Sequence, residues 1–364
     1  MTNRRALWTG AALLTALPGV AAGQMHEVSV AGHTLSLPAG FTISVFAENL
    51  RGVRYLTLGP HNVVYASVPR DGNIVRLPDV NGDGVADSTV PYATGLTRPF
   101  GLAWRADTLF VGDEDALIRI TPDGKRNQLA DLPAGQGHST RTVLLGPDNR
   151  LYVSIGSSCN LCDETDSRRA AVMQYQPDGT HGRPFATGLR NSAGVAFNPA
   201  SGELWGVNND RDNLGDDLPP EHLNIIKDGK WYGWPKCYLP GKNNPEYADA
   251  KCDTVEPPAL TFQAHSAPLG LAFYGGSQFP ADFKGDAFVT FHGSWNRSTP
   301  TGDKVIRVRV KGGKPVSSED FVTGWQLPDG TRWGRVVGLL VLPDGSLLIS
   351  DDQGGRIWRV TYGK

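Results

Sequence analysis

The chain has 364 residues, a formal net charge of −2 at neutral pH and no run of like charges. This length allows a large buried core, and the near-neutral charge makes nucleic acid and acidic membrane surfaces poor candidate partners. Glycine and proline are abundant, at 44 and 26 residues. Long stretches of helical periodicity are absent, which favours β-structure with many turns.

The first residues predict export. Arg4 and Arg5 precede an apolar run, residues 6–22, which is interrupted by a proline and ends in small residues. This pattern is typical of a cleavable signal peptide over residues 1–22, and the run is too short for a membrane span. The mature chain, residues 23–364, is therefore expected in the periplasm or outside the cell. A retained anchor is the alternative.

The mature chain reads as one repeated strand unit. Each unit has an apolar strand, a turn rich in Pro, Gly, Asp or Asn, a second apolar strand and often a third. Period-2 alternation between such turns predicts antiparallel β-structure, and the self-similarity predicts radial repetition. Six units are recognised, beginning at Leu56, Gly101, Thr142, Gly194, Gly270 and Val337.

Six such units predict an all-β fold, a six-bladed β-propeller of four-stranded antiparallel blades. The segment FTISVFAENL, from Phe41, has no complete blade of its own. We expect it to add the outer strand to the blade formed by the C-terminal units and so to close the ring. Since no linker-like composition separates the units, the mature chain is predicted to be a single propeller domain.

Four cysteines fit an oxidising compartment. Cys159 and Cys162, in CNLC, are expected to close a small disulfide loop, and Cys237 and Cys252 a larger one. A redox or zinc half-site is the alternative for CNLC, but no second close Cys or His pair accompanies it.

Polar residues, mostly cations, precede the first strand in unit after unit. In a propeller these positions converge at one end of the central channel, so their side chains are predicted to share one funnel. Several cations there predict an anionic ligand held by bidentate contacts. The set comprises Arg54, Arg98, His138 with Arg141, Arg190 with Asn191, His265 and Arg335.

The segment from Gly188 to Pro235 combines several features of a cofactor site. It contains the Arg-Asn pair named above, four Asp between Asp210 and Asp217, and the aromatic residues of WYGWP. Four acids in so short a loop require a positive partner if they are buried. A cation, an acidic loop and a stacking surface together favour a cofactor site over a packing unit.

Several stretches carry a family resemblance: GHSTRTVLLGPDNRLYVSIGSSCNLC, GLRNSAGVAFNP, NDRDNLGDDLPPEHLN with WYGWP, and FHGSWNR. They resemble the soluble pyrroloquinoline quinone (PQQ)-dependent sugar dehydrogenases, most closely the glucose/sorbosone dehydrogenase group. The resemblance covers residues 41–362. It implies oxidation of an aldose or a sorbosone-like sugar aldehyde at the anomeric carbon, by hydride transfer to the quinone, with electrons passed to a separate acceptor.

The resemblance also assigns roles to individual residues. His138 matches the general base that takes the proton of the anomeric hydroxyl, a role that suits an imidazole; a turn histidine bonded to backbone is the alternative. Arg190 matches an arginine beside the quinone oxygens, where a fixed cation stabilises developing charge, and Asn191 is its hydrogen-bonding neighbour. Arg335 matches an arginine that pairs with the cofactor carboxylates.

Other cofactor-binding assignments are looser. Arg297, in GSWNR, falls near a lysine-bearing loop of the family, and because the register is open by one, Asn296 is an alternative. Arg54 and Arg98 complete the predicted cofactor-binding set. His265 lies where family members differ, so its role is open.

Calcium is the metal that the resemblance implies, since PQQ offers a carboxylate, a ring nitrogen and a quinone oxygen to a hard cation. Carried over, the ligands are the backbone carbonyls of Asp212 and Asn213, with Asp210 as the neighbouring acid. Here NDRDN replaces the glycine-proline loop of the glucose enzymes. A solvated acidic loop is the alternative.

A second, structural calcium site is a candidate earlier in the chain, at residues 79–87. Oxygen side chains alternate there in the manner of a calcium loop, although the closing Glu is absent at the usual spacing. Asn-Gly and Asp-Gly also favour a bare turn. The candidate ligands are Asp79, Asn81, Asp83 and Asp87.

No nucleophile elbow, zinc-protease, Walker or dinucleotide motif is present. Asp113-Glu114-Asp115 is interpreted as a solvated strand-end loop. The rim loops over residues 157–169 and 238–256 are predicted to shape the sugar pocket. Two rival functions stay open: a metal-dependent propeller lactonase, and a non-catalytic propeller that binds a protein.

Overall fold

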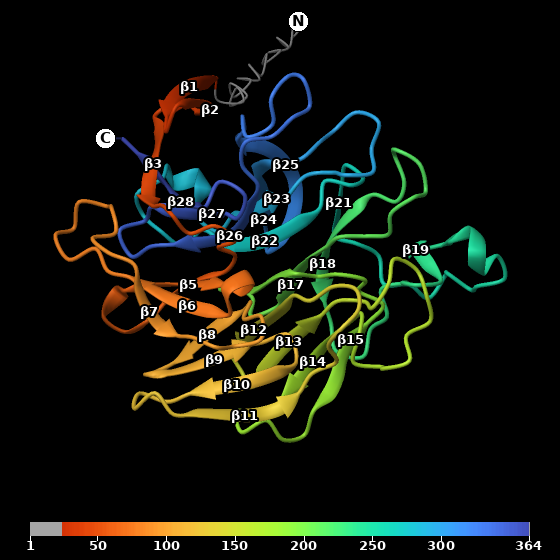
Figure 1. The fold of residues 1–364 in the computed structure, drawn as a ribbon. Coiled ribbons are helices and arrows are strands. Elements are labelled where there is room, and N and C mark those ends of the chain that lie inside the picture. The colour runs from red at the N-terminus through yellow and green to blue at the C-terminus, as the bar shows by residue number, and fades with distance from the viewer. Residues whose placement is uncertain (1–23, 364) are drawn as a thin grey trace, which may run out of the picture.

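The computed structural model describes residues 24–363, so the predicted signal peptide lies outside the described residues. Six four-stranded antiparallel sheets follow one another around the molecule (Figure 1). Among the described residues there is no α-helix, and the 3-10 helices are η1 (Pro60–Asn62), η2 (Pro69–Asp71), η3 (Pro245–Tyr247) and η4 (Ala281–Phe283). The predicted six-bladed β-propeller is confirmed.

The first three blades are each formed by consecutive strands. Blade 1 contains β4 (Leu56–Leu58), β5 (Val64–Val68), β6 (Asn73–Leu77) and β7 (Val90–Ala93). Blade 2 contains β8 (Leu102–Arg105), β9 (Thr108–Gly112), β10 (Ala116–Ile120) and β11 (Arg126–Asp131). Blade 3 contains β12 (Arg141–Leu145), β13 (Leu151–Ile155), β14 (Ala171–Tyr175) and β15 (Arg183–Thr187).

Blade 5 is also a simple meander, whereas blades 4 and 6 each take their outer strand from further along or from the other end of the chain. Blade 4 contains β16 (Gly194–Phe197), β17 (Leu204–Asn208), β18 (Glu221–Ile226) and β21 (Leu260–Phe262). Blade 5 contains β22 (Pro268–Phe273), β23 (Ala287–Phe291), β24 (Lys304–Lys311) and β25 (Lys314–Val322). Blade 6 contains β26 (Val336–Val341), β27 (Leu347–Asp351), β28 (Arg356–Tyr362) and β3 (Phe41–Ala47).

The ring closes as predicted, because β3 from the N-terminal region pairs with β28 from the C-terminal end. The register aligns Phe41 with Tyr362 and Ile43 with Val360. A hairpin of β1 (Met25–Val30) and β2 (His33–Pro38) precedes β3. Closing the last blade with a strand from the other end of the chain ties the two termini of the ring together and leaves no open sheet edge between them.

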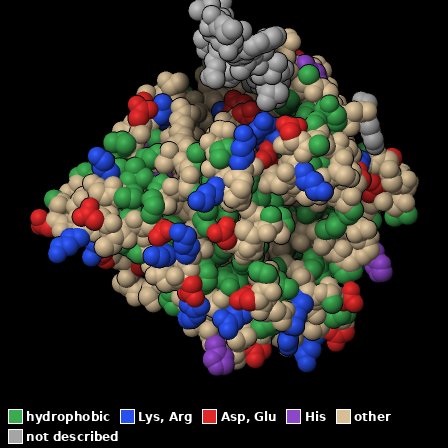
Figure 2. All heavy atoms as spheres, turned by 180° about the vertical axis from the view of Figure 1, so that it is seen from behind, with side chains coloured by type: hydrophobic (Ala, Val, Ile, Leu, Met, Phe, Trp, Pro, Cys, Tyr) green, Lys and Arg blue, Asp and Glu red, His purple; other side chains and the backbone are tan. Residues whose placement is uncertain are grey.

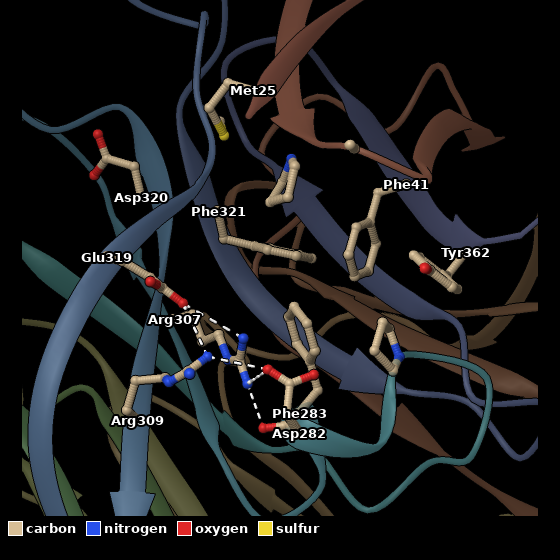
Figure 3. A pocket seen from close by; sticks show the side chains of 13 residues that line it. Met25, Phe41, Asp282, Phe283, Arg307, Arg309, Glu319, Asp320, Phe321 and Tyr362 are labelled. Carbon is tan, nitrogen blue, oxygen red and sulfur yellow. Dashed lines mark hydrogen bonds and ion pairs between the residues drawn. The ribbon is translucent and has the colours of Figure 1, made fainter. Parts of the chain in front are cut away.

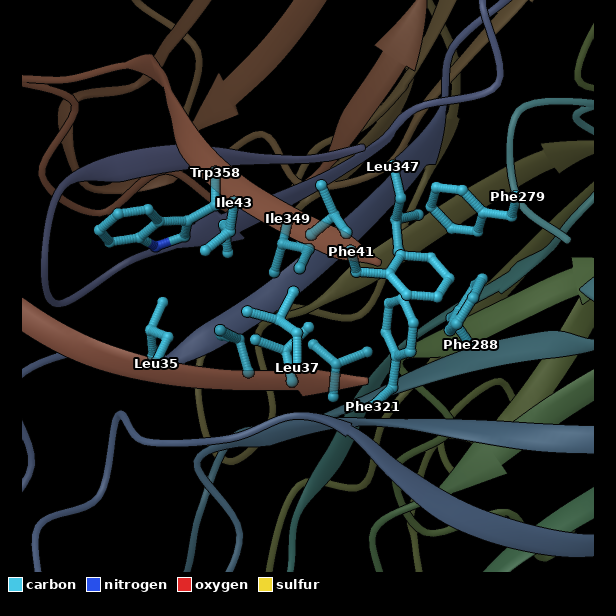
Figure 4. Packing of buried hydrophobic residues seen from close by; sticks show 14 of the residues in the cluster. Leu35, Leu37, Phe41, Ile43, Phe279, Phe288, Phe321, Leu347, Ile349 and Trp358 are labelled. Carbon is cyan, nitrogen blue, oxygen red and sulfur yellow. The ribbon is translucent and has the colours of Figure 1, made fainter. Parts of the chain in front are cut away.

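Apolar side chains fill the spaces between neighbouring blades. The second strands β5, β13, β17, β23 and β27 are buried along their whole length, because a sheet packs on each of their faces. One aromatic cluster joins blades 5 and 6, where Phe41 meets Phe279 and Phe321 edge-on (Figure 4). Leu35 and Leu37 of the hairpin complete this cluster.

Neighbouring blades also approach closely along their first strands. Thr290 Oγ1 of blade 5 donates to the Val337 carbonyl of blade 6 at 2.6 Å. Gly270 lies at the same contact, where an added Cβ atom would be 2.1 Å from the Val337 carbonyl oxygen. Glycine recurs at this point in several units because only a residue without a side chain allows this approach.

We expect Gly270→Ala to destabilise the ring by about 1–3 kcal/mol, the usual cost of forcing a methyl group into a packed core. The free energy of unfolding from denaturant titration measures this effect. Gly275→Ala is the matched control, because an added Cβ atom there meets nothing within 4 Å. Equal stability of the two variants would contradict the close-approach explanation.

Both predicted disulfides are present, Cys159–Cys162 and Cys237–Cys252. The second closes the excursion of blade 4 that carries β19 (Cys237–Leu239) and β20 (Lys242–Asn243). In the described part of the chain, no helix has the length and hydropathy needed to cross a bilayer. Figure 2 shows acidic and basic side chains interspersed over one face, without a large area of one sign.

Candidate functional site

The first strands of the six blades surround a central channel, which contains a cavity of about 220 Å³. Tyr55, just before β4, reaches across it, and its hydroxyl lies 3.1 Å from the Ala193 carbonyl oxygen and 3.3 Å from that of Leu269. Ala193, Leu269 and Val337 form a small buried apolar cluster. The loops that lead into the first strands carry His138, Arg190, Arg335 and other predicted site residues.

His138 lies in the loop before β12, and its imidazole is held in one tautomer. Nδ1 is 3.1 Å from the carbonyl oxygen and 3.0 Å from Oγ of Ser157. A carbonyl oxygen only accepts, so Nδ1 carries the proton and Nε2 keeps its lone pair. Burial, and then the charge of Arg190, lower the pKa of His138 to about 3. The neutral imidazole can therefore act as a general base through Nε2.

Arg141 holds the loop that carries His138. Its side chain is fully buried. The guanidinium donates to the carbonyl oxygens of His138 at 2.8 Å, Thr140 at 2.9 Å and Glu114 at 3.1 Å, and also to that of Pro133. Donors that are turned to backbone carbonyls are not available to a ligand. The grouping of Arg141 with the ligand-binding cations was therefore wrong, because a position in the repeat does not fix the direction of a side chain.

Arg190, before β16, has all five N–H donors occupied by the described residues. Nε and Nη2 donate to the carbonyl and side-chain oxygens of Asn160 at 3.1 and 2.9 Å. Nη1 donates to the carbonyls of Asn209 at 3.2 Å and Asp210 at 2.7 Å. Nη2 also pairs with the Asp212 carboxylate at 3.0 Å. Arg190 is thus a fixed buried charge that also holds the acidic loop in place.

Asn191 lies beside His138. Only a glycine, Gly156, separates the two side chains: an added Cβ atom there would be 2.5 Å from His138 Cβ and 2.8 Å from Asn191 Oδ1. The backbone N–H of Asn191 donates to Asn208 Oδ1 at 3.1 Å. This close approach places an amide next to the candidate base. The resemblance implied instead that Asn191 bonds to its neighbour Arg190, whose side-chain partners in the described residues are Asn160, Asn209, Asp210 and Asp212.

In three blades a similar hydrogen bond fixes the loop that leads into the first strand. A side-chain oxygen at the end of the second strand, or just after it, accepts a backbone N–H of that loop. The pairs are Asp113 with Arg98 at 2.6 Å, Asn208 with Asn191 at 3.1 Å and Asp351 with Arg335 at 2.8 Å. Asp113 and Glu114 are buried, so the interpretation of this acidic stretch as solvated was wrong. The exposed Arg98 side chain pairs with Glu114 at 3.4 Å.

Arg54 and Arg335 are linked by His292 and Asp352, which the sequence analysis missed. Arg54 Nη1 lies 2.6 Å from Asp352 Oδ2, and His292 Nε2 lies 3.1 Å from the same oxygen. Arg335 Nε donates to the His292 carbonyl at 2.9 Å. Burial raises the pKa of Asp352, but the hydrogen bond from His292 and the charge of Arg54 outweigh it and hold that pKa below its usual range.

His265 and Arg297 contact the acidic loop from blade 5. His265 Nε2 is 2.8 Å from the Gly215 carbonyl oxygen. Arg297 Nη1 lies 3.1 Å from the Asp217 carboxylate. These contacts join the acidic loop between β17 and β18 of blade 4 to two loops of blade 5, one before β22 and one between β23 and β24. That His138, Arg190 and Arg335 face one shared cavity stays a prediction.

Three of the predicted cofactor-binding residues keep buried polar atoms without a hydrogen-bond partner. These atoms are Arg54 Nε, Arg297 Nε and both amide atoms of Asn296. Isolated cases also occur inside blades, such as Trp205 Nε1. Buried donors and acceptors are normally satisfied. A polar ligand rich in acceptor oxygens would satisfy the two guanidinium donors and the amide N–H groups, so the residues present fit an anionic group.

The predicted calcium residues differ in their surroundings. The Asp210 carboxylate is buried, accepts a backbone N–H and lies 3.8 Å from His222 Nδ1, so only its carbonyl faces Arg190. The Asp212 carboxylate faces Arg190 directly. Asn213 is exposed, with a φ of 65°. Oxygens that suit a hard cation therefore gather around Arg190, but the Asp210 carboxylate is not among them.

In the second predicted calcium loop the side chains bond the loop itself. Asp79 accepts the Gly84 N–H at 2.9 Å, and Asn81 accepts that of Asp83 at 2.9 Å. Asp87 accepts that of the residue after Asp79 at 2.5 Å. Over residues 24–363, one group of three His, Cys, Asp or Glu ligands is close enough for a metal, and it lies elsewhere. These contacts favour the turn interpretation, and calcium binding here stays a prediction.

Glu221 is a buried carboxyl beneath the acidic loop. Its two oxygens accept the backbone N–H groups of Asp210 at 2.8 Å and Ala267 at 3.1 Å. Burial raises the pKa of Glu221 to about 8. Sequence reasoning missed this residue, because nothing in PPEHLN distinguishes it from a surface glutamate.

We expect stability to depend on the protonation of Glu221. Its folded pKa lies above the ordinary value of 4.5, so the folded state binds the extra proton and stability is lost as pH rises from 4.5 through about 8. Glu221→Gln should remove this loss. The lowered pKa of His138 makes stability rise with pH instead, but only below the ordinary histidine pKa of 6.5. Denaturant titrations between pH 6.5 and 8 therefore isolate the glutamate, and an unchanged slope in the variant would contradict the assignment.

A second cavity, of about 360 Å³, is lined by the third and fourth strands of blades 5 and 6, β24, β25, β28 and β3, rather than by the first strands (Figure 3). Its wall contains Phe41, Phe283 and Phe321. Arg307 lies over the Phe283 ring at 3.4 Å and pairs with Asp282 at 3.1 Å. The charge in this wall is neutralised by its neighbours, so the cavity is not included in the candidate site.

The fold and the site define a class of protein: a six-bladed propeller with a neutral histidine and several buried or half-buried arginines in the loops that lead into its first strands. Comparison with known proteins leads further. The TrAA12-like family model matches residues 35–244 and 239–363, and the chain belongs to this family.

A PQQ-dependent sugar dehydrogenase of Hypocrea jecorina is 27% identical over 84% of this chain and 80% of that protein. The holo PQQ domain of the pyranose dehydrogenase of Coprinopsis cinerea aligns with a TM-score of 0.78 at 21% identity, over 90% and 97% of the two chains. The calcium structure of the Trichoderma reesei family AA12 enzyme aligns with a TM-score of 0.79 at 23% identity, over 93% of this chain and 99% of that chain. The likeness to these structures shows the fold, and the resemblance to PQQ-dependent sugar dehydrogenases is confirmed.

Proposed function

We propose that this protein is a PQQ-dependent oxidoreductase that oxidises an aldose or a sorbosone-like sugar aldehyde at its anomeric carbon. The observation that carries the proposal is the state of His138. Its Nδ1 faces the Ser157 carbonyl, its pKa is lowered, and no side-chain hydrogen bond in the described part of the chain reaches Nε2. An imidazole in this state accepts the proton of an anomeric hydroxyl.

The arginines supply the complementary charge. Arg190 is a buried cation close enough to His138 to lower its pKa, and such a fixed charge stabilises negative charge that develops during the oxidation. Arg54, Arg297 and Asn296 have the unpartnered polar atoms that would hold the cofactor carboxylates. When bound, PQQ supplies the two-electron acceptor for the hydride that leaves the sugar.

Calcium is proposed as the second component of this site. The Asp210 carbonyl lies 2.7 Å and the Asp212 carboxylate 3.0 Å from the Arg190 guanidinium, and Asn213 is next along the loop. A carbonyl oxygen has a second lone pair, so an oxygen that accepts from an arginine can also bind a cation.

A metal-dependent lactonase and a non-catalytic binding module are the rival functions. The group of three potential metal ligands in residues 24–363 is Cys159, Cys162 and Glu164, and its two sulfurs are joined in a disulfide. A lactonase of the side-chain-ligated kind therefore has less support than the quinoprotein. Both disulfides suit the proposed location in the periplasm or outside the cell.

The deciding experiment is reconstitution of the apoprotein with PQQ and Ca²⁺. A quinone absorbance that survives gel filtration and is bleached by sugar supports the proposal, and a panel of sugars with a dye as electron acceptor then identifies the substrate. A chelator should prevent reconstitution. Protein that retains no quinone under these conditions would rule the proposal out.

A further inference from the structure

The Cys159–Cys162 disulfide closes a small ring beside the residues that carry the proposed chemistry. The two cysteines are three positions apart, in the loop between β13 and β14. A Cys-x-x-Cys pair often indicates redox or metal chemistry. Here the nearest carboxylate, Glu164, has both oxygens bonded to Ser158, at 2.6 and 2.7 Å. The disulfide ring is better explained as a structural element that fixes the position of a residue inside it, Asn160.

Asn160 lies inside this ring and joins three parts of the site. Its Oδ1 accepts from Arg190 Nη2 at 2.9 Å and from the Asp212 backbone N–H at 2.7 Å, and its Nδ2 donates to the Asp212 carbonyl at 3.1 Å. Its own carbonyl accepts from Arg190 Nε at 3.1 Å and from Trp234 Nε1 at 3.2 Å. Both the side chain and the carbonyl of Asn160 take part in these contacts.

Ser157 connects the same loop to His138. It is fully buried, and its Oγ donates to the Cys159 carbonyl at 2.7 Å. Its carbonyl faces His138 Nδ1, and its N–H donates to the Arg190 carbonyl at 2.7 Å. One short loop therefore orients both the proposed base and the fixed cation.

We infer that the Cys159–Cys162 ring is a positioning device for the cofactor site, with Asn160 as the positioning residue. A short loop of irregular backbone has many conformations, and a covalent ring removes most of them before any ligand binds. Held in this way, Asn160 keeps Arg190 and Asp212 in one arrangement. One consequence of this inference, weaker cofactor binding when the ring is opened, rests on the proposed function.

The first test needs no cofactor. In the apoprotein, the indole N–H of Trp234 reports directly on Asn160, and its NMR signal is assigned with Trp234→Phe. Cys159→Ser with Cys162→Ser, which opens this ring and leaves Cys237–Cys252 intact, is expected to shift this signal and to speed its hydrogen exchange. An unchanged signal after the ring is opened would overturn the inference whatever the protein binds.

The second test measures PQQ affinity, from tryptophan fluorescence in the presence of Ca²⁺. Opening the ring or making Asn160→Ala is expected to weaken binding by about 10–100-fold, the usual effect of removing a supporting partner of a ligand site. Cys237→Ser with Cys252→Ser is the matched control, and its affinity should stay within about twofold because no atom of that pair contacts Arg190 or Asn160. Thermal unfolding of each variant separates loss of fold from loss of the site.

The two failures are distinguishable. If the unaltered protein binds no PQQ, the proposed function is wrong, and the Trp234 signal still decides the role of the ring. If the unaltered protein binds PQQ and both the open-ring variant and Asn160→Ala bind it equally well, the ring is not a positioning device.

Discussion

Replacing His138 with alanine is expected to reduce turnover of the reconstituted enzyme by about 10²–10⁴-fold, the usual contribution of a positioned general base. PQQ should still bind, because the side chain of His138 is not among the cations expected to hold its carboxylates. The structural reason is the lone pair on Nε2, which the Ser157 carbonyl leaves free by fixing the proton on Nδ1. Steady-state turnover and PQQ affinity, measured on the same preparation, check both parts.

Two further substitutions separate basicity from packing. His138→Asn keeps an N–H that can donate to Ser157 but has no basic nitrogen, so it should be as inactive as the alanine variant. His181→Gln is the control, because this exposed histidine bonds only Thr180, at 2.9 Å. Normal turnover by His138→Ala would show that the proton is taken by another group.

The propeller is predictable from the sequence because its signals are local and repeated. Each unit has its own turn residues and alternating strands, and glycines such as Gly101, Gly194 and Gly270 recur where blades approach. The closing strand from Phe41 follows from the same count, since one blade is otherwise incomplete. The disulfide partners are likewise close in sequence, at separations of 3 and 15.

The connections within the site are less predictable, because they join side chains that are distant in sequence. Asn160 meets Asp212 across 52 positions, and His292 meets Asp352 across 60. The two cysteines of CNLC suggest redox chemistry, although it is one of the residues between them, Asn160, that contacts Arg190 and Asp212. A signal for Asp352 was present, since two acids stand at the end of the second strand in units 2 and 6, where Asp113-Glu114 corresponds to Asp351-Asp352.

Replacing Arg190 with alanine is expected to impair both cofactor affinity and turnover, the latter by about 10²–10³-fold, as for other removed charge-stabilising donors. The change removes the cation opposite Asp212, leaves the carbonyls of Asn209 and Asp210 without their side-chain donor, and removes one of the two donors to the Asn160 carbonyl. Breaking a buried ion pair also costs about 3–5 kcal/mol of stability. Assays therefore have to be run well below the unfolding midpoint of the variant.

Arg190→Lys distinguishes the charge from the scaffold. Lysine keeps the positive charge but has three donors in place of five, so it cannot hold Asn160 and the acidic loop together. If the charge dominates, this variant recovers most of the turnover; if the scaffold dominates, it resembles Arg190→Ala. Because every N–H of the Arg190 side chain is already bonded within the protein, we expect its structural contacts to dominate cofactor affinity and its charge to dominate turnover.

Arg183→Ala, which removes an exposed ion pair with Asp228, is the control. Wild-type cofactor affinity in Arg190→Ala would show that Arg190 is not part of the cofactor site.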